Sequence, residues 1–207
     1  MSLSSLLSFQ FIDWLSDHYI ELFGAITGLV YIFLEIKQKP VMWVVGFITS
    51  SVYIIVFFQA KFYADMALNV YYVFISIFGW YSWRFMKKDN GEITERSISR
   101  IRLPLSVLLF FISFVLFLII GYVLDNFTDS PIPYYDALST ALSIVATWML
   151  ARKILEHWVL WVFINFFSVI LYLWRELYPT ALLFMVYGLL SIRGWLEWKR
   201  SLKSQLK

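Results

Sequence analysis

The sequence predicts an all-α membrane protein with seven transmembrane helices, arranged as two parallel groups of three joined by one linking helix. Two observations predict this class. The 207-residue chain is 61% hydrophobic and 21% aromatic with a mean hydropathy of +0.73, which lies far outside the range of a soluble domain. The second half of the chain also repeats the pattern of the first, which predicts two similar structural units.

Seven apolar stretches are long enough to cross a hydrocarbon core of ~30 Å at about 1.5 Å per residue. They are Ile20–Ile36, Val41–Phe58, Tyr63–Trp83, Leu103–Leu124, Tyr135–Leu150, Trp158–Trp174 and Tyr178–Trp198. The first and fifth are short, but the repeat supports them by pairing them with each other. Residues 1–19 carry Asp13 and Asp17 and no Lys or Arg, so we expect no cleavable signal peptide.

The internal repeat relates residues 24–83 to residues 139–198 through a shift of 115 positions with no gap. Under this shift Gly79, Trp80 and Trp83 fall on Gly194, Trp195 and Trp198. A register that holds over 60 residues is hard to obtain by chance. We therefore expect each half to be one unit, with the site between the two units.

A unit of three helices ends on the side of the membrane opposite to its start, so a fourth helix is needed to make the two units parallel. The helix at 103–124 fits this role because it is almost purely Leu, Phe, Ile and Val. Such a 3+1+3 plan is similar to that of SWEET transporters. The predicted organisation is an extracytoplasmic segment (1–19), a first repeat (20–84), a cytoplasmic loop (85–102), the linker helix (103–124), an outer loop (125–134), a second repeat (135–198) and a cytoplasmic tail (199–207).

The basic residues predict the orientation. One side of the predicted membrane carries only Lys61 and Arg175 in its loops, whereas the other carries fourteen Lys and Arg, and Arg193 lies inside the last helix. By the positive-inside rule, the N-terminus lies outside a bacterial inner membrane and the C-terminus lies in the cytoplasm. The outer loops are acidic, which would attract a cationic solute.

Aromatic and polar side chains recur at helical spacing and form a candidate solute site. On the sixth helix Trp158, Trp161 and Asn165 share one face, and an asparagine at that depth needs a hydrogen-bond partner. Trp158 alone also fits an interfacial anchor, and Asn165 alone also fits a contact between helices. Similar faces on the second and third helices of the units add Trp43, Ser50, Asn69, Tyr72 and Tyr187 to the candidates.

Other recurrent residues fit packing better than solute binding. Gly24 and Gly28, with Ser139 and Ser143 in the second half, fit close helix crossings. The tryptophans beside cytoplasmic Lys and Arg fit an interfacial belt; they are Trp80, Trp83, Trp195 and Trp198.

The missing residue types narrow the chemistry. No Asp or Glu falls within the predicted membrane interior, which favours facilitated movement without proton or sodium coupling. The chain has no cysteine, and His18 and His157 fall at opposite faces, so we expect no metal, no cofactor and no enzyme activity. An uncharged lining of Trp, Tyr, Asn, Ser and Thr suits a flat organic cation held by cation–π contacts.

Motifs in both halves resemble those of the PnuC family of vitamin transporters, over roughly residues 20–200. They are Trp43-x-x-Gly46, Phe62-Tyr63-Ala64-Asp65, Leu68-Asn69 and Gly79-Trp80-Tyr81-x-Trp83, then Arg152-Lys153, Glu156-x-Trp158-x-x-Trp161, Tyr172 and Gly194-Trp195-x-x-Trp198.

The resemblance implies facilitated uptake of nicotinamide riboside, with thiamine as the alternative that related proteins carry. It also adds Thr147 to the site, because riboside carriers tend to have glutamine at the matching position. Downhill uptake implies a functional link to a cytoplasmic kinase that traps the solute. Besides the bilayer, the sequence leaves a homo-oligomer open and predicts no nucleic-acid partner. A membrane sensor or enzyme is a distant alternative, which the missing ionisable groups disfavour.

Overall fold

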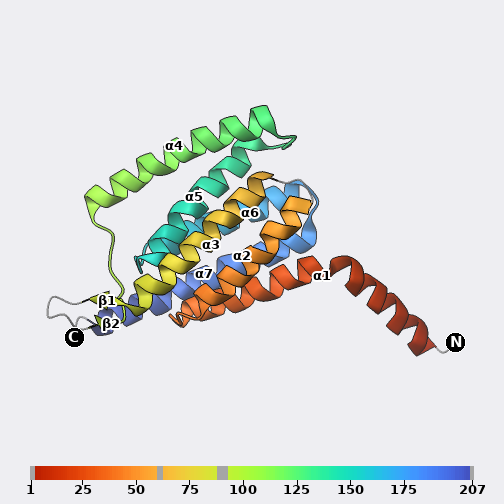
Figure 1. The fold of residues 1–207 in the computed structure, drawn as a ribbon, viewed down its shortest axis with the longest axis horizontal. Helices are drawn as coiled ribbons and strands as arrows, with labels where there is room; N and C mark the ends of the chain where they lie inside the picture. The colour runs from red at the N-terminus through yellow and green to blue at the C-terminus, as the bar shows by residue number, and fades with distance from the viewer. Residues whose placement is uncertain (1–2, 60–62, 88–92, 206–207) are drawn as a thin grey trace.

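The computed structural model describes residues 3–59, 63–87 and 93–205, which form seven helices and one short hairpin (Figure 1). The helices are α1 (Leu3–Ile36), α2 (Met42–Gln59), α3 (Tyr63–Arg84), α4 (Leu103–Phe127), α5 (Pro133–Ala151), α6 (His157–Trp174) and α7 (Tyr178–Gln205). The strands β1 (Met86–Lys87) and β2 (Ile93–Thr94) pair antiparallel between α3 and α4. The predicted all-helical class with seven helices is confirmed for this part of the chain.

The helix bounds agree with the sequence prediction to within three residues for α2 through α6. α7 continues beyond Trp198 to Gln205, and α1 begins at Leu3 instead of Ile20. No Gly or Pro interrupts residues 1–23, so the helix can extend towards the N-terminus through this segment. This N-terminal part of α1 projects away from the other helices (Figure 1).

Four helices among the described residues are long and apolar enough to cross a membrane, namely α2, α4, α6 and α7. The most apolar of them, α4, has large side chains such as Phe110, Phe111 and Phe114 exposed along its length. Exposed aromatic and aliphatic side chains on this scale suit contact with lipid, not water.

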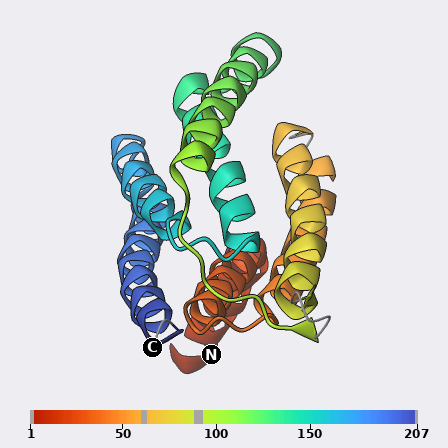
Figure 2. The ribbon, with the colours of Figure 1, turned by 90° about the vertical axis from the view of Figure 1, so that its left-hand side faces the viewer.

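Helix packing follows the same pattern in the two halves. Within each half the second and third helices pack together, as α2 with α3 and α6 with α7. The first helix of each half packs on the second helix of its own half and on the third helix of the other, so α1 contacts α2 and α7, and α5 contacts α3 and α6. Figure 2 shows the pairs α2–α3 and α6–α7 on opposite sides, with α1 and α5 between them.

The connections α1–α2 and α5–α6 also match. Gln38 and Lys153, which the repeat relates, both adopt positive φ, 54° and 50°, and terminate the helix before them. The next residue then donates its N–H five residues back, from Lys39 to Leu34 O at 2.9 Å and from Ile154 to Met149 O at 3.0 Å. This is the Schellman arrangement that caps the C-terminus of a helix.

Two tryptophans join the halves at the core. The indole N–H of Trp83 donates to Leu150 O at 3.2 Å, and the indole N–H of Trp198 donates to Glu35 O at 3.1 Å. Both donors and both acceptors are related by the 115-residue shift. Trp83 and Trp198 are fully buried, so their interpretation as interfacial belt residues is wrong. That interpretation relied on nearby basic residues, but these two side chains point inward from helices whose outer faces carry the charges.

Trp80 and Trp195 differ from this buried pair. They are only partly buried, and Arg84 and Lys199 lie over their rings at 5.7 and 6.0 Å from the ring centroids. These contacts fit the predicted interfacial position.

The segment before α4 is not the freely solvated connection that its charges predict. Ser99 pairs with the α5–α6 connection through Ser99 N to Lys153 O at 3.0 Å and Leu155 N to Ser99 O at 2.9 Å. Ile98 is buried, and Ile101 N donates to the Glu156 carboxylate at 2.9 Å. Ile98 and Ile101 are the apolar residues of an otherwise polar run from Arg96 to Arg102, and they pack against the helices.

Candidate functional site

Two adjoining cavities lie between the helices of the two halves. The wide cavity has a volume of about 250 Å³ and is lined by α1, α2 and α3, with Thr147 of α5 and Trp161 of α6. The narrow cavity has a volume of about 130 Å³ and is lined by α1, α6 and α7. Gly28, Tyr31 and Trp161 belong to the walls of both, so the two cavities meet at these residues.

The structure brings eight of the nine predicted site residues to these walls. The wide cavity is lined by Trp43, Ser50, Tyr72, Thr147 and Trp161, and the narrow cavity by Trp158, Trp161, Asn165 and Tyr187. Asn69 lines neither wall. That the eight residues bind a solute stays a prediction.

Equivalent faces of α2 and α6 build the two cavities. Trp43 and Ser50 of α2 correspond to Trp158 and Asn165 of α6 under the 115-residue shift, and all four are buried. Between these positions, the 115-residue shift aligns Gly46 of α2 with Trp161 of α6. The absent side chain of Gly46 leaves room for the Tyr31 ring, whereas Trp161 lines both cavities.

The small residues of α1 serve both packing and the cavity. A Cβ atom added at Gly24 would collide with the Tyr53 hydroxyl, and one added at Gly28 would collide with the Tyr187 hydroxyl. The predicted role in close packing is therefore right, although the close neighbours are tyrosine side chains. Gly24 and Gly28 also line the wide cavity.

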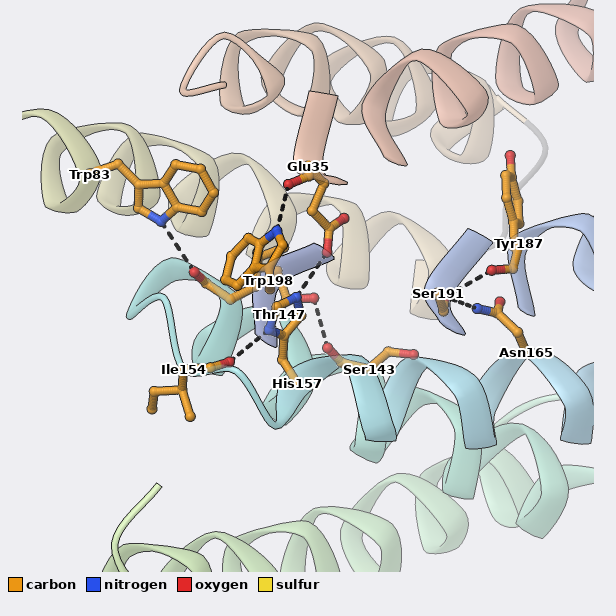
Figure 3. A network of polar contacts seen from close by, with 11 residues as sticks. Glu35, Trp83, Ser143, Thr147, Ile154, His157, Asn165, Tyr187, Ser191 and Trp198 are labelled. Carbon is orange, nitrogen blue, oxygen red and sulfur yellow. Dashed lines mark hydrogen bonds and ion pairs between the residues drawn. The ribbon is translucent and has the colours of Figure 1, made fainter. Parts of the chain in front are cut away.

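Two polar side chains of the walls are oriented by hydrogen bonds (Figure 3). The Asn165 amide donates to Ser191 Oγ at 3.2 Å, and Ser191 Oγ donates to Tyr187 O at 2.8 Å. Asn165 thus both joins α6 to α7 and faces the narrow cavity. Thr147 Oγ1 donates to Ser143 O at 2.7 Å, which leaves its oxygen able to accept a hydrogen bond from a solute.

Several donors in the walls have no acceptor. The indole N–H groups of Trp43, Trp158 and Trp161 and the hydroxyl of Thr49 are buried without a hydrogen-bond partner among the described residues. An unsatisfied buried donor costs about 1–3 kcal/mol. All four side chains belong to residues that line one of the cavities.

A buried acid–base pair contradicts the expectation that the interior has no carboxylate. Glu35 is only 3% exposed and His157 is fully buried, and Glu35 Oε1 lies 3.0 Å from His157 Nε2 (Figure 3). Glu35 also lines the narrow cavity. Glu35 stands near the end of the first predicted apolar stretch, two residues before Lys37. The repeat carried the missing signal, because Glu35 corresponds to Leu150, which is fully buried.

Other ionisable groups behave differently from expectation or fall outside the described residues. Arg193 belongs to α7, but its side chain is exposed and donates a hydrogen bond to the Glu197 carboxylate at 3.0 Å. The side chains of His18 and Lys61 lie outside the described part of the chain. Within that part, no three His, Cys, Asp or Glu residues are grouped so as to hold a metal ion.

The α5–α6 connection contains a buried lysine, Lys153, which packs against a tryptophan of the core. Lys153 Nζ lies 4.4 Å from the centroid of the Trp83 ring, and only 4% of the residue is exposed. Burial lowers the pKa of Lys153 to about 8, because the charged form loses its hydration. Burial also lowers the pKa of Arg96, with a smaller contribution from Arg152.

Comparison with known protein families relates the sequence of this chain to one family. The sequence model of the family described as "Nicotinamide mononucleotide transporter" matches residues 18–200. The chain belongs to this family. The predicted resemblance to PnuC transporters is thus confirmed, and the protein is a multi-pass membrane transporter.

The curated relatives carry the name nicotinamide riboside transporter PnuC. The protein from Escherichia coli (strain K12) is 27% identical over 209 residues, which cover 90% of this chain and 87% of the relative. The protein from Neisseria mucosa is 25% identical over 195 residues, covering 90% and 74%. The crystal structure of the vitamin B3 transporter PnuC superposes with a TM-score of 0.71 at 21% identity, covering 97% of this chain and 88% of that chain, and so shares the fold.

Proposed function

We propose that this transporter takes up nicotinamide riboside across the inner membrane by facilitated diffusion. A cytoplasmic kinase then traps the solute by phosphorylation. Its relatives in the nicotinamide mononucleotide transporter family are named as nicotinamide riboside transporters, which supports this solute. The observation that carries the proposal is the pair of cavities whose buried indole N–H groups lack acceptors within the described structure.

The riboside matches these walls in shape and in hydrogen bonding. Its pyridinium ring is a flat cation, which indole faces bind with ~0.5–2 kcal/mol each. We assign the ring to the junction of the cavities, against Trp161 and Trp158. The ribose hydroxyls and the carboxamide oxygen then accept from the unpaired indole N–H groups, and Asn165, Tyr72 and Tyr187 supply further polar contacts.

We further propose the 3+1+3 plan with two parallel units and α4 as the linker, in the manner of SWEET transporters. The matched hydrogen bonds of Trp83 and Trp198 and the matched ends of α1 and α5 support it. The N-terminus then lies outside and the C-terminus in the cytoplasm. A C-terminal green fluorescent protein fusion should fluoresce in intact cells, and a dark fusion with an active alkaline phosphatase fusion at the same end would contradict this orientation.

Uncoupled movement remains the proposal despite the buried acid. Among the described residues Glu35 is the only buried carboxylate, and it is paired with His157 at the end of the bundle where the basic connections lie. A gradient-driven carrier usually has a carboxylate along the pathway that is exposed to both sides in turn. Glu35 lines the narrow cavity near the end assigned to the cytoplasm, where it would exchange a proton with that side alone.

Thiamine is the second candidate, because Thr147 stands in the wide cavity where riboside carriers tend to have glutamine. Titrating each vitamin into the purified protein while following tryptophan fluorescence distinguishes them, since three indoles line the walls. We expect nicotinamide riboside to quench the fluorescence at lower concentration than thiamine. Binding of thiamine alone would replace the first assignment by the second.

A further inference from the structure

The Glu35–His157 pair lies in the wall of the proposed site, yet the proposed function gives it no role. Glu35 lines the narrow cavity beside Trp158, and the centroid of the His157 ring lies 4.7 Å from that of Trp158 and 4.8 Å from that of Trp198. The pair joins α1 to α6 through the 3.0 Å contact between Glu35 Oε1 and His157 Nε2. A buried acid and base at the edge of a cavity for a cation call for a functional explanation.

The hydrogen bonds fix the number of protons on the pair. His157 Nδ1 lies 2.7 Å from Ile154 O, and a carbonyl oxygen only accepts, so Nδ1 carries a proton. The contact between Nε2 and Oε1 requires one further proton, on either atom. The pair is therefore neutral as a whole, whether it is written as imidazolium and carboxylate or as imidazole and carboxylic acid.

A cation in the narrow cavity changes this balance. Loss of the shared proton leaves a neutral imidazole and a carboxylate, with a net charge of −1 beside a positive ring. Opposite charges attract strongly where water is excluded, which offsets the cost of releasing the proton. We propose that Glu35 is the counter-charge for the positive ring of the solute, and that binding of the cation displaces the proton that Glu35 shares with His157.

This inference rests on the proposed function and leaves transport uncoupled. The pair lies beside the connections that carry Lys37, Lys39 and Lys153, at the end assigned to the cytoplasm. The proton leaves to that side when the cation binds and returns from that side when the cation leaves. No net proton crosses the membrane, but the affinity depends on the pH of the cytoplasm.

The other ionisable groups around the pair are few. Tyr31 of α1 interacts electrostatically with Glu35, and Tyr187 of α7 lines the same cavity, but phenols stay neutral near pH 7. Lys37 pairs with Glu197 of α7 at 3.7 Å. Lys153 lies over Trp83, and α2 contributes no Asp, Glu, Lys, Arg or His.

Isothermal titration calorimetry of the purified full chain tests the inference. Nicotinamide riboside and benzamide riboside, an uncharged isostere with carbon in place of the ring nitrogen, are titrated between about pH 6 and pH 8. Buffers of different ionisation enthalpy count the protons released. We expect the cation to release close to one proton and to bind up to about tenfold tighter per unit of rising pH, with no such effect for the isostere.

Two variants separate this role from a structural one. In Glu35→Gln the proton release and the pH dependence should vanish, while the isostere binds as in the wild type, which also shows that the variant is folded. In His157→Gln, Glu35 loses the partner that stabilises its ionised form, so the buried carboxyl group holds its own proton and the cation should still displace close to one proton. Glu197→Gln removes a carboxylate at the same end that lines neither cavity, and it should behave as the wild type.

The outcomes distinguish this inference from the proposed function. Binding of the riboside without proton release, equal pH dependence for the isostere, or wild-type behaviour of Glu35→Gln would overturn the role of Glu35 and leave the transport proposal standing. A wild-type protein that binds neither riboside nor isostere would overturn both.

Discussion

Trp83 and Trp198 occupy equivalent positions in the two halves of the chain, and their ring centroids lie 5.9 Å apart in the fully buried core. Each indole N–H donates to the first helix of the opposite half: Trp83 donates to Leu150 O of α5, and Trp198 donates to Glu35 O of α1. The two halves thus meet through the same contact made twice. Glu35, whose carbonyl oxygen accepts the second of these hydrogen bonds, also lines the narrow cavity, so the core and the proposed site share a residue.

Replacing either tryptophan of this pair by phenylalanine should destabilise the protein by a similar amount. Trp83→Phe and Trp198→Phe each remove one hydrogen bond, worth about 0.5–1.5 kcal/mol, while Leu150 O and Glu35 O keep the hydrogen bonds that they accept from Lys153 N and Gln38 N. Thermal unfolding in detergent measures this, with the exposed Trp174→Phe as control. A large loss for one variant and none for the other would contradict the equivalence of the two contacts.

Trp161 should contribute more to binding than any other tryptophan, because it alone among them lies in the walls of both cavities. Removing its ring in Trp161→Ala should weaken riboside binding by ~1–2 kcal/mol, or about five- to thirtyfold. Trp174→Ala, at an exposed position, should leave the affinity unchanged. Equal losses in the two variants would show that tryptophan packing, and not contact with the solute, sets the affinity.

Thr147→Gln should shift the preference between the two vitamins. Thr147 is buried in the wall of the wide cavity, and a glutamine there adds an amide donor and an acceptor. We expect riboside binding to strengthen, or thiamine binding to weaken, by about 1 kcal/mol, the scale of one hydrogen bond. Competition titrations measure the ratio, and an unchanged ratio would remove Thr147 from the residues that select the solute.

Lys153 should make stability depend on pH above about pH 8. Its pKa is lowered to about 8 in the folded protein, whereas a lysine in the unfolded chain ionises near pH 10.4. Between these values the unfolded state holds more protons, so the free energy of unfolding should rise with pH by about 1–2 kcal/mol. Below about pH 8 both states are protonated and the effect is absent.

The difference between wild type and Lys153→Met isolates this contribution in thermal unfolding measured from about pH 7 to pH 10. Lys203→Met removes one positive charge at an exposed position of α7 and serves as control. A Lys153→Met variant whose stability rises with pH as steeply as that of the wild type would assign the effect to another group.

Much of the fold follows from local patterns in the sequence. Apolar length and the 115-residue repeat predict the ends of α2 through α6 closely, because a membrane span has a fixed length and a repeat constrains both copies. The start of α1 was not predicted because a helix that continues beyond the apolar span has no membrane boundary to mark its end. The docking of Ile98 was missed because it depends on a partner distant in the sequence.

The site was predicted where helical spacing alone places side chains on one face, as for Trp158, Trp161 and Asn165. The pairing of Glu35 with His157 could not be derived that way, because it joins two residues on different helices, 122 positions apart in the sequence. Trp83 and Trp198 were misassigned for a related reason. Position near a membrane surface gives the depth of a side chain, but not whether it faces lipid or protein.

Uptake of labelled nicotinamide riboside into proteoliposomes tests the central claim most directly. The liposomes contain a riboside kinase and ATP, and the Trp161→Ala protein serves as control. We expect accumulation of label that requires the kinase and persists when ionophores collapse the proton and sodium gradients. Loss of accumulation on adding the ionophore, with kinase activity intact, would contradict facilitated diffusion, and absence of uptake by folded wild-type protein would contradict the assigned solute.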